Sequence, residues 1–570
     1  MTRPLRSNFE PGTTRWAMRR AQWRAMGLSA EDEVKPKIAI VNSSSGLASC
    51  FSHLDGIVAP LKAAIRSAGG VPFEVRTAAP SDAITSAGQA GQYILPSRDL
   101  VVHDIEVAVE GAQLDGMVCL ASCDKTAPAH LMAAARLDLP TIVVACGYQA
   151  TGRYRGEHVD FEDIFLRAGH VASGRLTVAE LGEMSECAIG GPGVCAGMGT
   201  ANSMHIACEA LGMAMAGSTP VRANGDRMWR AVHRAGTRIV ELVDEDVRPR
   251  QILTPDAFRN AVTAILAVSG SVNCLKHLQA VAVEAGCDVD IWRLFEELAA
   301  DVPLLTGVKP NGDRHVDEFE DAGGTPALLK QLAPLLRLDA PTVTGPRLGE
   351  LLSDVRVADP EVIRPLADPL ARHPAIVVVR GSLAPDGAII KRTVADDAPL
   401  RFRGPARVFT SREEGLAAIR RGEVRRGEVL VLRGLGLRGS PGMGLTSAFV
   451  FALDGAGLGE HVAVITDGQL SGLVNKGLVV GEVAPEAATG GPLGLVEKGD
   501  EILVDVRERR VDLLVDEEIL AARRDRLPPP VPAVGCGWLD VYAREVGPLT
   551  EGATLGGRLP RPTAGSGGWT

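Results

Sequence analysis

Cys123, Asp124 and Lys125 place a soft sulfur ligand, a hard oxygen ligand and an amine next to one another in the chain. Cys50 and Cys195 lie in other polar or glycine-rich segments. Three cysteines brought together from distant loops could hold an iron–sulfur cluster and leave one iron open to a substrate oxygen. The simpler interpretation is that the cysteines are small buried hydrophobic residues and that Asp124 and Lys125 form a solvated pair.

Ser471 is a second candidate for chemistry. It follows an apolar segment, residues 462–465, which breaks at Asp467-Gly468, and a second apolar segment comes after it. A serine in such a glycine-containing turn can bring its hydroxyl and its backbone close to a bound ligand. Most Ser-Gly pairs in loops are simple turns, so the turn by itself does not define a site.

The elements that would position the cysteines alternate between strands and helices. They are expected at residues 35–44, 58–70, 73–82, 99–112, 114–123, 130–139 and 140–146. Their short connections favour an α/β domain with a mainly parallel sheet. Ligands bind beyond the carboxyl ends of the strands in such sheets, and Cys50, Asp82 and Cys123 are each expected at such an end.

The later part of the chain has a different pattern. Residues 175–335 are predominantly helical in periodicity, and a segment rich in Pro, Asp and Arg near 340–375 is typical of a connection between domains. Short apolar segments punctuated by Gly, Pro and Asp follow, which predicts a β-rich, barrel-like domain. We therefore expect an N-terminal arm, an α/β domain, a β-rich domain with the Ser471 loop and a mobile tail, at residues 1–34, 35–370, 371–548 and 549–570.

The composition excludes several classes of protein. The 570 residues are 46% hydrophobic and 23% charged, as in ordinary globular proteins. A formal net charge of -10 argues against nucleic acid as a partner, and no apolar segment is long enough to span a bilayer. The first residues are basic and lack the apolar core of a signal peptide, so a cytoplasmic protein is expected. The 10 cysteines contain no CxxC pair, which argues against zinc ribbons and thioredoxin-like sites.

Several long motifs of unusual composition run through both halves of the chain. They are KPKIAIVNS, ILPSRD, CDKTAPAHLMAAARLDLPTIVV, GVCAGMGTANSM, VSGSVNCLKHL, DAGGTPALLKQL, GSLAPDGAIIK, TDGQLSG and GGPLGLVEKGD. With these motifs the chain resembles the dihydroxy-acid and sugar-acid dehydratase family, which includes phosphogluconate and aldonate dehydratases, over nearly its whole length. The sequence CDKT followed by PA is more similar to the sugar-acid branch.

The resemblance implies two cofactors. One is an iron–sulfur cluster, [2Fe–2S] with [4Fe–4S] as the alternative, held by Cys50, Cys123 and Cys195. The other is a magnesium ion near Asp82, Asp124 and Lys125, where the lysine of family members is carbamylated and becomes an anionic oxygen ligand. Mg²⁺ prefers hard oxygen ligands, so this set suits it.

The resemblance also implies a reaction. Ser471 would act as the base that removes the C2 proton of a small 2,3-dihydroxy or polyhydroxy (aldonic) acid. Magnesium would hold the substrate carboxylate and 2-hydroxyl, and the open iron would act as Lewis acid on the departing 3-hydroxyl. The enol product would tautomerise to a 2-keto acid. Family members are usually homodimers or homotetramers, so a homo-oligomer is expected.

One departure from the family pattern bears directly on the metal. Family members usually carry a glutamate that ligates magnesium in a GPGMPE-like segment, and here SPGMGLTSAF puts Leu445 in its place. A leucine cannot coordinate a hard cation, so magnesium binding should be weaker. Residues 45–47 lack the usual acid, and residues 146–149 (CGYQ) replace a GGPM-like turn. The alternative hypothesis is a diverged paralogue that is non-catalytic or catalyses a different elimination or isomerisation.

Other residues have structural explanations. His53 is expected to pack or cap behind Cys50, and the remaining cysteines at 119, 146, 208, 274 and 287 are expected to be core thiols rather than ligands. Lys476 lies near the Ser471 turn and could supply positive charge to a carboxylate, although a solvated lysine is the commoner case. Glu482 has no predicted role.

Overall fold

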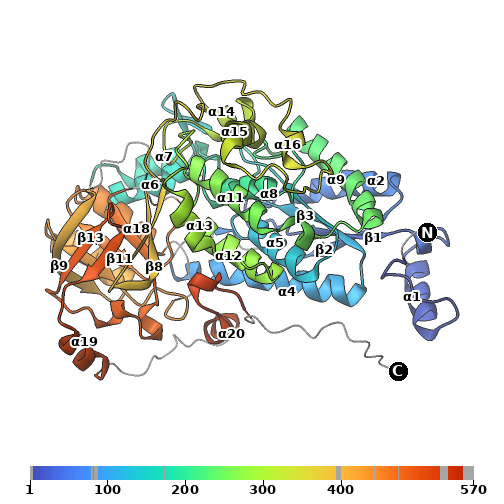
Figure 1. Cartoon of the computed structure of the whole chain (residues 1–570). Coiled ribbons are helices and arrows are strands. Elements are labelled where there is room, and N and C mark those ends of the chain that lie inside the picture. The colour runs from blue at the N-terminus through green and yellow to red at the C-terminus, as the bar shows by residue number, and fades with distance from the viewer. Residues whose placement is uncertain are drawn as a thin grey trace.

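The computed structural model describes residues 4–78, 81–82, 88–172, 174–392, 399–440, 445–472, 474, 476–526 and 537–555. An α/β domain with a four-stranded sheet is followed by a closed eight-stranded barrel, and the two lie side by side (Figure 1). The predicted fold class, a parallel α/β domain followed by a barrel-like β domain, is confirmed. No helix among the described residues combines the length and apolar character needed to cross a membrane.

The sheet of the first domain is parallel throughout and has the order β2-β1-β3-β4. Its strands are β1 (Lys37–Asn42), β2 (Val71–Arg76), β3 (Gly116–Ala121) and β4 (Thr141–Ala145). Every residue of β1, β3 and β4 is buried, as expected for strands that helices cover on both faces. The strand order reverses direction between β1 and β3, and ligands bind at such a switch point in open α/β sheets.

Helices of the first domain follow the strands and pack in pairs. α2 packs against α9, and α4 packs against α5. Their bounds are α2 (Leu54–Ser67), α4 (Ile94–Ala112), α5 (Thr126–Leu137) and α9 (Asp226–Glu245). α9 buries residues spaced three or four apart, including Met228, Val232, Ala235 and Ile239, so it presents one apolar face to the domain.

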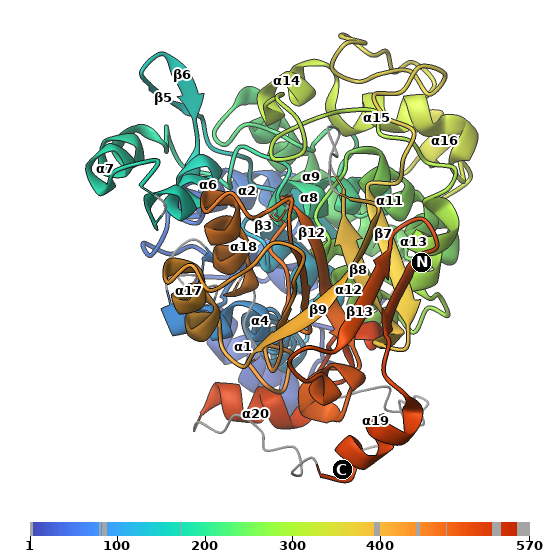
Figure 2. The same cartoon turned by 90° about the vertical axis from the view of Figure 1, so that its left-hand side faces the viewer.

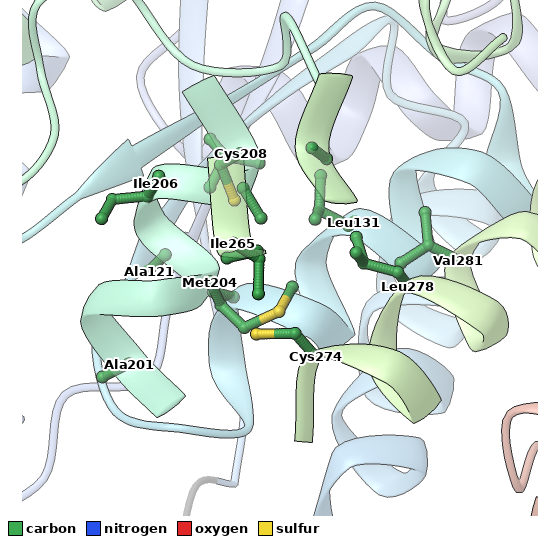
Figure 3. Close-up of a cluster of buried hydrophobic side chains, with 14 of the residues drawn as sticks. Ala121, Leu131, Ala201, Met204, Ile206, Cys208, Ile265, Cys274, Leu278 and Val281 are labelled. Atoms are coloured by element: carbon green, nitrogen blue, oxygen red, sulfur yellow. The ribbon is translucent and has the colours of Figure 1, made fainter. Parts of the chain in front are cut away.

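A run of helices covers the α/β domain, and all but the first and the last of them lie within the region predicted to be helical, residues 175–335. They are α6 (Phe161–Ala172), α7 (Val178–Cys187), α8 (Thr200–Ala210), α10 (Pro249–Ile252), α11 (Pro255–Ala267), α12 (Asn273–Ala285), α13 (Ile291–Leu298), α14 (Val316–Asp321), α15 (Gly324–Leu332) and α16 (Leu348–Leu351), with the short hairpin β5 (Gly152–Tyr154) and β6 (Glu157–Val159) before α6. Figure 3 shows the buried cluster where α8, α11 and α12 meet α5, with the sulfur atoms of Met204 and Cys274 close together. Cys208 lies in the same cluster, so these two cysteines fill the core, as the sequence predicted.

The barrel closes in the order β10-β11-β12-β8-β7-β14-β13-β9. Its strands are β7 (Ile376–Gly381), β8 (Ala384–Lys391), β9 (Arg401–Phe409), β10 (Val429–Leu432), β11 (Ala463–Thr466), β12 (Leu478–Ala484), β13 (Glu501–Asp505) and β14 (Arg510–Leu513). α17 (Arg412–Arg420), α18 (Leu445–Gly455), α19 (Glu517–Arg524) and α20 (Trp538–Glu545) complete this half (Figure 2).

Alternate residues of a barrel strand belong to different cores. Val429 and Val431 of β10 join the apolar cluster formed mainly by the barrel strands, whereas Leu430 and Leu432 join the large cluster shared with the α/β domain. Successive side chains of a strand point to opposite faces, so one strand serves the barrel's own core and the packing between the two domains.

The end of the described chain is held by a buried ion pair in the ILPSRD motif. Arg98 donates hydrogen bonds to the carbonyls of Gly552 and Ala553, and Asp99 accepts one from the backbone N–H of Leu555. Residues 549–555 were expected to begin a mobile tail, and for them the structure corrects that expectation, because they pack against the α/β domain. The rest of the expected tail, 556–570, lies outside the described residues.

Candidate active site

A cavity of about 110 Å³ lies where the carboxyl ends of β1 and β3 meet the Ser471 turn of the barrel domain. It is lined by six of the seven residues that the sequence singled out: Cys50, Asp82, Cys123, Asp124, Cys195 and Ser471. The seventh, Lys125, is buried and forms an ion pair with Asp82. The cavity therefore brings together loops of the α/β domain and of the barrel that are hundreds of residues apart in sequence.

The three cysteines form the sulfur side of the cavity. Cys50 and Cys123 are buried, and Cys195 is partly exposed. Hydrogen bonding to Cys50, followed by burial, raises the pKa of Cys123 well above its ordinary value. Burial also raises the pKa of Cys195, and the carboxylates of Glu162 and Asp124 add to that effect. Thiolates in these positions would need positive charge, which the irons of a cluster can supply.

Two hydrogen bonds to neighbouring segments fix the loop that carries Cys50. The Ser122 hydroxyl donates a short hydrogen bond to the carbonyl of Cys50. His53 makes a 2.7 Å hydrogen bond through Nε2 to the carbonyl of Cys146, the residue after β4. His53 is buried, and burial lowers its pKa. It supports the loop rather than lining the cavity, in agreement with the role expected for it.

Asp82, Asp124 and Lys125 form the oxygen side of the cavity. Lys125 Nζ lies 3.1 Å from Asp82 Oδ2 and 3.9 Å from Asp124 Oδ2. Burial raises the pKa of Asp82 to about 7 against the opposing effect of the Lys125 ammonium. Asp82 Oδ1 has no hydrogen-bond partner among the described residues. An unpartnered carboxylate oxygen beside a second carboxylate is a donor set that suits a hard cation.

In the described part of the chain, no three His, Cys, Asp or Glu side chains are arranged to hold a single metal ion. The three thiols line one cavity instead, which fits a cluster with its own sulfide bridges better than one coordinated ion. On the oxygen side, Mg²⁺ habitually keeps several waters, so one or two carboxylates are enough to bind it. The residues present therefore fit both groups that the resemblance implies.

Glu162 is a cavity residue that the sequence did not indicate. It lies in the first turn of α6 and is 3% exposed. The start of α6 is fixed because the Asp160 carboxylate accepts a hydrogen bond from the backbone N–H of Asp163. Burial raises the pKa of Glu162 well above its ordinary value, and its Oε2 has no partner among the described residues. Glu162 is followed directly by Asp163, and acidic residues are common in the first turn of a helix, so the sequence pattern does not distinguish Glu162 as a cavity residue.

The Ser471 turn is held in place by Asp467. Its carboxylate accepts hydrogen bonds from the backbone N–H groups of Gly434, Leu435 and Ala487, which come from two other loops at the same end of the barrel. Asp467 was interpreted only as a turn residue, and the structure shows that it joins three loops. A rigid platform of this kind can present a serine hydroxyl at a fixed position.

Gly472 lets the turn approach the α/β domain. A Cβ at this position would lie 2.7 Å from the Ser271 hydroxyl, closer than any side chain tolerates. The Gly472 carbonyl accepts a 2.9 Å hydrogen bond from the buried Lys391 at the end of β8. Burial lowers the pKa of Lys391 to about 8. Lys476, which the sequence suggested as a source of positive charge near Ser471, is exposed.

Among the departures from the family pattern, the segment 146–149 contributes a residue to the cavity lining, Gln149. α18 begins at Leu445, whose side chain lies outside the described residues. α18 packs parallel to α6, with Phe165 edge-on to Phe451 and His170 3.1 Å from Asp454. In the segment 146–149, Tyr148 donates a 2.5 Å hydrogen bond to Glu320, and Gln149 lines the cavity.

Comparison with known proteins covers both halves of the chain. Residues 35–351 match the model described as dihydroxy-acid/6-phosphogluconate dehydratase N-terminal, and residues 361–553 match its C-terminal counterpart. A dihydroxy-acid dehydratase of Ignicoccus hospitalis is 41% identical over 544 residues, which cover 95% of this chain and 98% of the relative. A protein with the same name from Methanococcoides burtonii is 39% identical over 96% of this chain and 99% of its own length. Another from Pyrococcus abyssi is 40% identical over 95% of this chain and 98% of its own length.

Proposed function

The chain belongs to the dihydroxy-acid/6-phosphogluconate dehydratase family and is a dehydratase, and on that basis we propose that it converts a small 2,3-dihydroxy or polyhydroxy carboxylic acid to a 2-keto acid. The observation that carries this proposal is the single cavity lined by three cysteines, two aspartates and Ser471. A structural explanation for each residue taken singly does not account for their convergence from five separate loops of two domains.

The chemistry is an elimination of water. Ser471, as an alkoxide, takes the proton from C2 of the substrate, the electron pair of that C–H bond forms the C2–C3 double bond, and the C3–O bond breaks as the leaving hydroxide accepts the proton from Ser471 and departs as water. The enol then tautomerises to the 2-keto acid. When bound, an iron–sulfur cluster and Mg²⁺ would supply Lewis acids for the leaving hydroxyl and for the substrate carboxylate and 2-hydroxyl.

The residues of the chain would hold the substrate and the base at fixed positions relative to each other. Cys50, Cys123 and Cys195 would hold the cluster, while Asp82 and Asp124 would hold Mg²⁺ with a carbamylated Lys125. Asp467 and Lys391 fix the turn that carries Ser471. The buried surroundings of the cavity have a lower dielectric than water, which strengthens each of these interactions.

The test is an anaerobic assay of protein reconstituted with iron and sulfide, in which 2-keto acid is measured from a panel of aldonic and alkyl dihydroxy acids. We expect a brown protein that forms keto acid from at least one of them, and a Cys123→Ser variant that loses both the visible absorbance and the activity. A colourless protein after reconstitution, or coloured protein inactive on every acid, would overturn the proposal.

A second candidate function rests on Leu445. With a leucine where family members carry a magnesium-ligating glutamate, the protein is a diverged paralogue that catalyses another elimination or isomerisation, or that binds an acid without reacting. Leu445→Glu separates the two candidates. If this substitution creates dehydration of ordinary aldonic acids that the native protein lacks, the second candidate is supported; if native activity is already present, it is excluded.

A further inference from the structure

Glu162 sits in a cradle made by the glycine loop that follows Cys195. A Cβ at Gly197 would lie 2.4 Å from Glu162 Oε2, and one at Gly199 would lie 3.2 Å from Oε1. Side chains at these two positions would therefore occupy the space of the carboxyl group. The two glycines leave room for an acid that is buried, that lines the cavity, and whose Oε2 has no partner among the described residues.

Two further polar groups with an unsatisfied atom line the same cavity. Asn202 donates to the carbonyls of Cys195 and Gly197 at 2.9 and 2.8 Å, and its Oδ1 has no partner in the described structure. Gln149 Nε2 is also buried and unpartnered within that part of the chain. Glu162 and Asn202 both reach Gly197, so two acceptors flank one loop. Leaving such atoms unpaired is costly, and Gln149 Nε2 is a donor whereas Asn202 Oδ1 is an acceptor, which points to a ligand with hydroxyl groups that both donate and accept hydrogen bonds.

The remaining lining of the cavity includes apolar groups. Phe161, Phe165, Ile189 and Val194 contribute to it. An alkyl chain would satisfy these walls and leave Glu162 buried without a partner. A chain of hydroxyl-bearing carbons has apolar C–H faces for the walls and O–H groups for the acceptors. A site built to hydrogen-bond a hydroxyl strongly rejects the analogue that lacks it.

The buried Lys391 ammonium acts to lower the pKa of Glu162, but Glu162 Oε2 has no hydrogen-bond partner among the described residues. The Asp124 carboxylate acts to raise the same pKa, so a metal ion and a substrate hydroxyl are the two ligands that Oε2 could take. The Mg²⁺ dependence measured below separates these two ligands.

We propose that Glu162, supported by Asn202 and Gln149, is the specificity-determining residue of the cavity and binds a hydroxyl that the substrate carries beyond C2 and C3. The inference rests on the proposed dehydration and narrows its substrate to polyhydroxy acids of the aldonic class. The Glu162 carboxyl forms a hydrogen bond with that hydroxyl, while the apolar walls contact the carbon chain. A dihydroxy acid with only alkyl substituents would leave this carboxyl unpaired.

The experiment compares a hexonic acid with a 2,3-dihydroxy acid that bears alkyl substituents, on reconstituted native protein, Glu162→Gln and Glu162→Val. We expect native protein to favour the hexonic acid in kcat/KM by at least about tenfold. Glu162→Val should remove or invert that ratio, and Glu162→Gln, which keeps a hydrogen-bonding group of the same shape, should keep most of it. Equilibrium binding of each acid to the Ser471→Ala protein, measured by calorimetry, provides a readout without turnover.

The outcomes separate the two proposals. Native protein that dehydrates neither acid overturns the proposed function, and the calorimetric preference then still tests Glu162. Equal losses on both acids in Glu162→Val, or native preference for the alkyl acid, overturn the inference. A rise in the Mg²⁺ concentration needed for half-maximal activity, with the substrate ratio unchanged, would make Glu162 a metal ligand and would also overturn it.

Discussion

Two buried lysine–carboxylate pairs lie near the domain interface and differ in what surrounds them. Lys125 and Asp82 pair at 3.1 Å beside the cavity, where the Asp82 side chain is 24% exposed and its second oxygen has no partner among the described residues. Lys276 of α12 and Glu482 of β12 pair at 2.5 Å, and both side chains are 0% exposed. The second oxygen of Glu482 likewise has no partner among the described residues, so the two pairs differ in exposure and not in the hydrogen bonding of that oxygen. The first pair faces a space that a ligand can enter; the second is sealed between two domains.

The sealed pair, Lys276 and Glu482, contacts residues of the site without lining the cavity. Lys276 also donates to Asn273, which lines the cavity, and the Glu482 carboxylate accepts a hydrogen bond from the backbone N–H of Leu470, next to Ser471. Pairing with a carboxylate that lines the cavity, rather than burial, therefore distinguishes Lys125 from Lys276, whose partner does not line it. Each prediction below tests that distinction.

Breaking the sealed pair should have the largest effect. Glu482→Leu leaves the Lys276 ammonium buried without its partner, which costs about 3–5 kcal/mol of folding free energy. We expect a fall of that size in the urea unfolding free energy. The double variant Lys276→Met/Glu482→Leu removes both charges and should regain most of it. A loss below about 1 kcal/mol in the single variant would show that the pair is not sealed.

Lys125→Met should separate activity from stability. It removes the group that pairs with Asp82, and we expect keto-acid formation to fall by about 10²–10³-fold, as when one preorganised polar group is lost from a site. The free energy of unfolding should change much less than in Glu482→Leu, because the Asp82 carboxylate can take up a proton or be solvated in the cavity. The matched control is Lys476→Met, an exposed lysine near the same turn, which should keep native activity.

Lys391 is buried and donates a hydrogen bond to Gly472, next to Ser471, and its lowered pKa predicts that the free energy of unfolding depends on pH. Burial lowers its pKa to about 8, so between about pH 8 and 10.5 the unfolded chain binds more protons at this site than the folded protein. Its contribution to stability therefore rises with pH through that window, and Lys391→Met should remove the rise. Unfolding free energies measured from pH 7.5 to 10 in both proteins provide the check. Identical slopes would contradict the prediction.

The sequence predicted the features that follow from local sequence pattern, which are the parallel sheet and the loops at one of its edges. Alternating strands and helices indicated a parallel α/β domain, and parallel strands end at one edge of a sheet, so loops bearing Cys50, Asp82 and Cys123 were expected together. Ser471 and Cys195 were singled out by their glycine-containing segments, and the family resemblance supplied their roles. The cofactors, the roles of these residues and the homo-oligomer stay predictions that the assays above test.

The sequence missed residues whose role depends on a partner in another domain. Glu482 had no predicted role, because Lys276 lies about two hundred residues away and only the packing of α12 against the barrel joins them. Lys391 ends an apolar strand and gave no sign that it reaches Gly472, whereas Lys476 was proposed because it is close in sequence. Glu162 depends on the space that Gly197 and Gly199 leave, which no periodicity reports.

A surface pair on α9 gives the smallest expected effect and sets the scale for the others. Arg238 Nη2 lies 2.6 Å from Glu245 Oε2, a distance close to that of Lys276 and Glu482, but the Glu245 side chain is 47% exposed. Water already solvates that carboxylate, so a double-mutant cycle with Arg238→Ala and Glu245→Ala should give a coupling below about 1 kcal/mol. The same cycle at Lys276 and Glu482 should give several times more. If the two couplings were equal, distance rather than access to solvent would set the strength of these pairs, and the contrast between the cavity and the sealed interface would lose its physical basis.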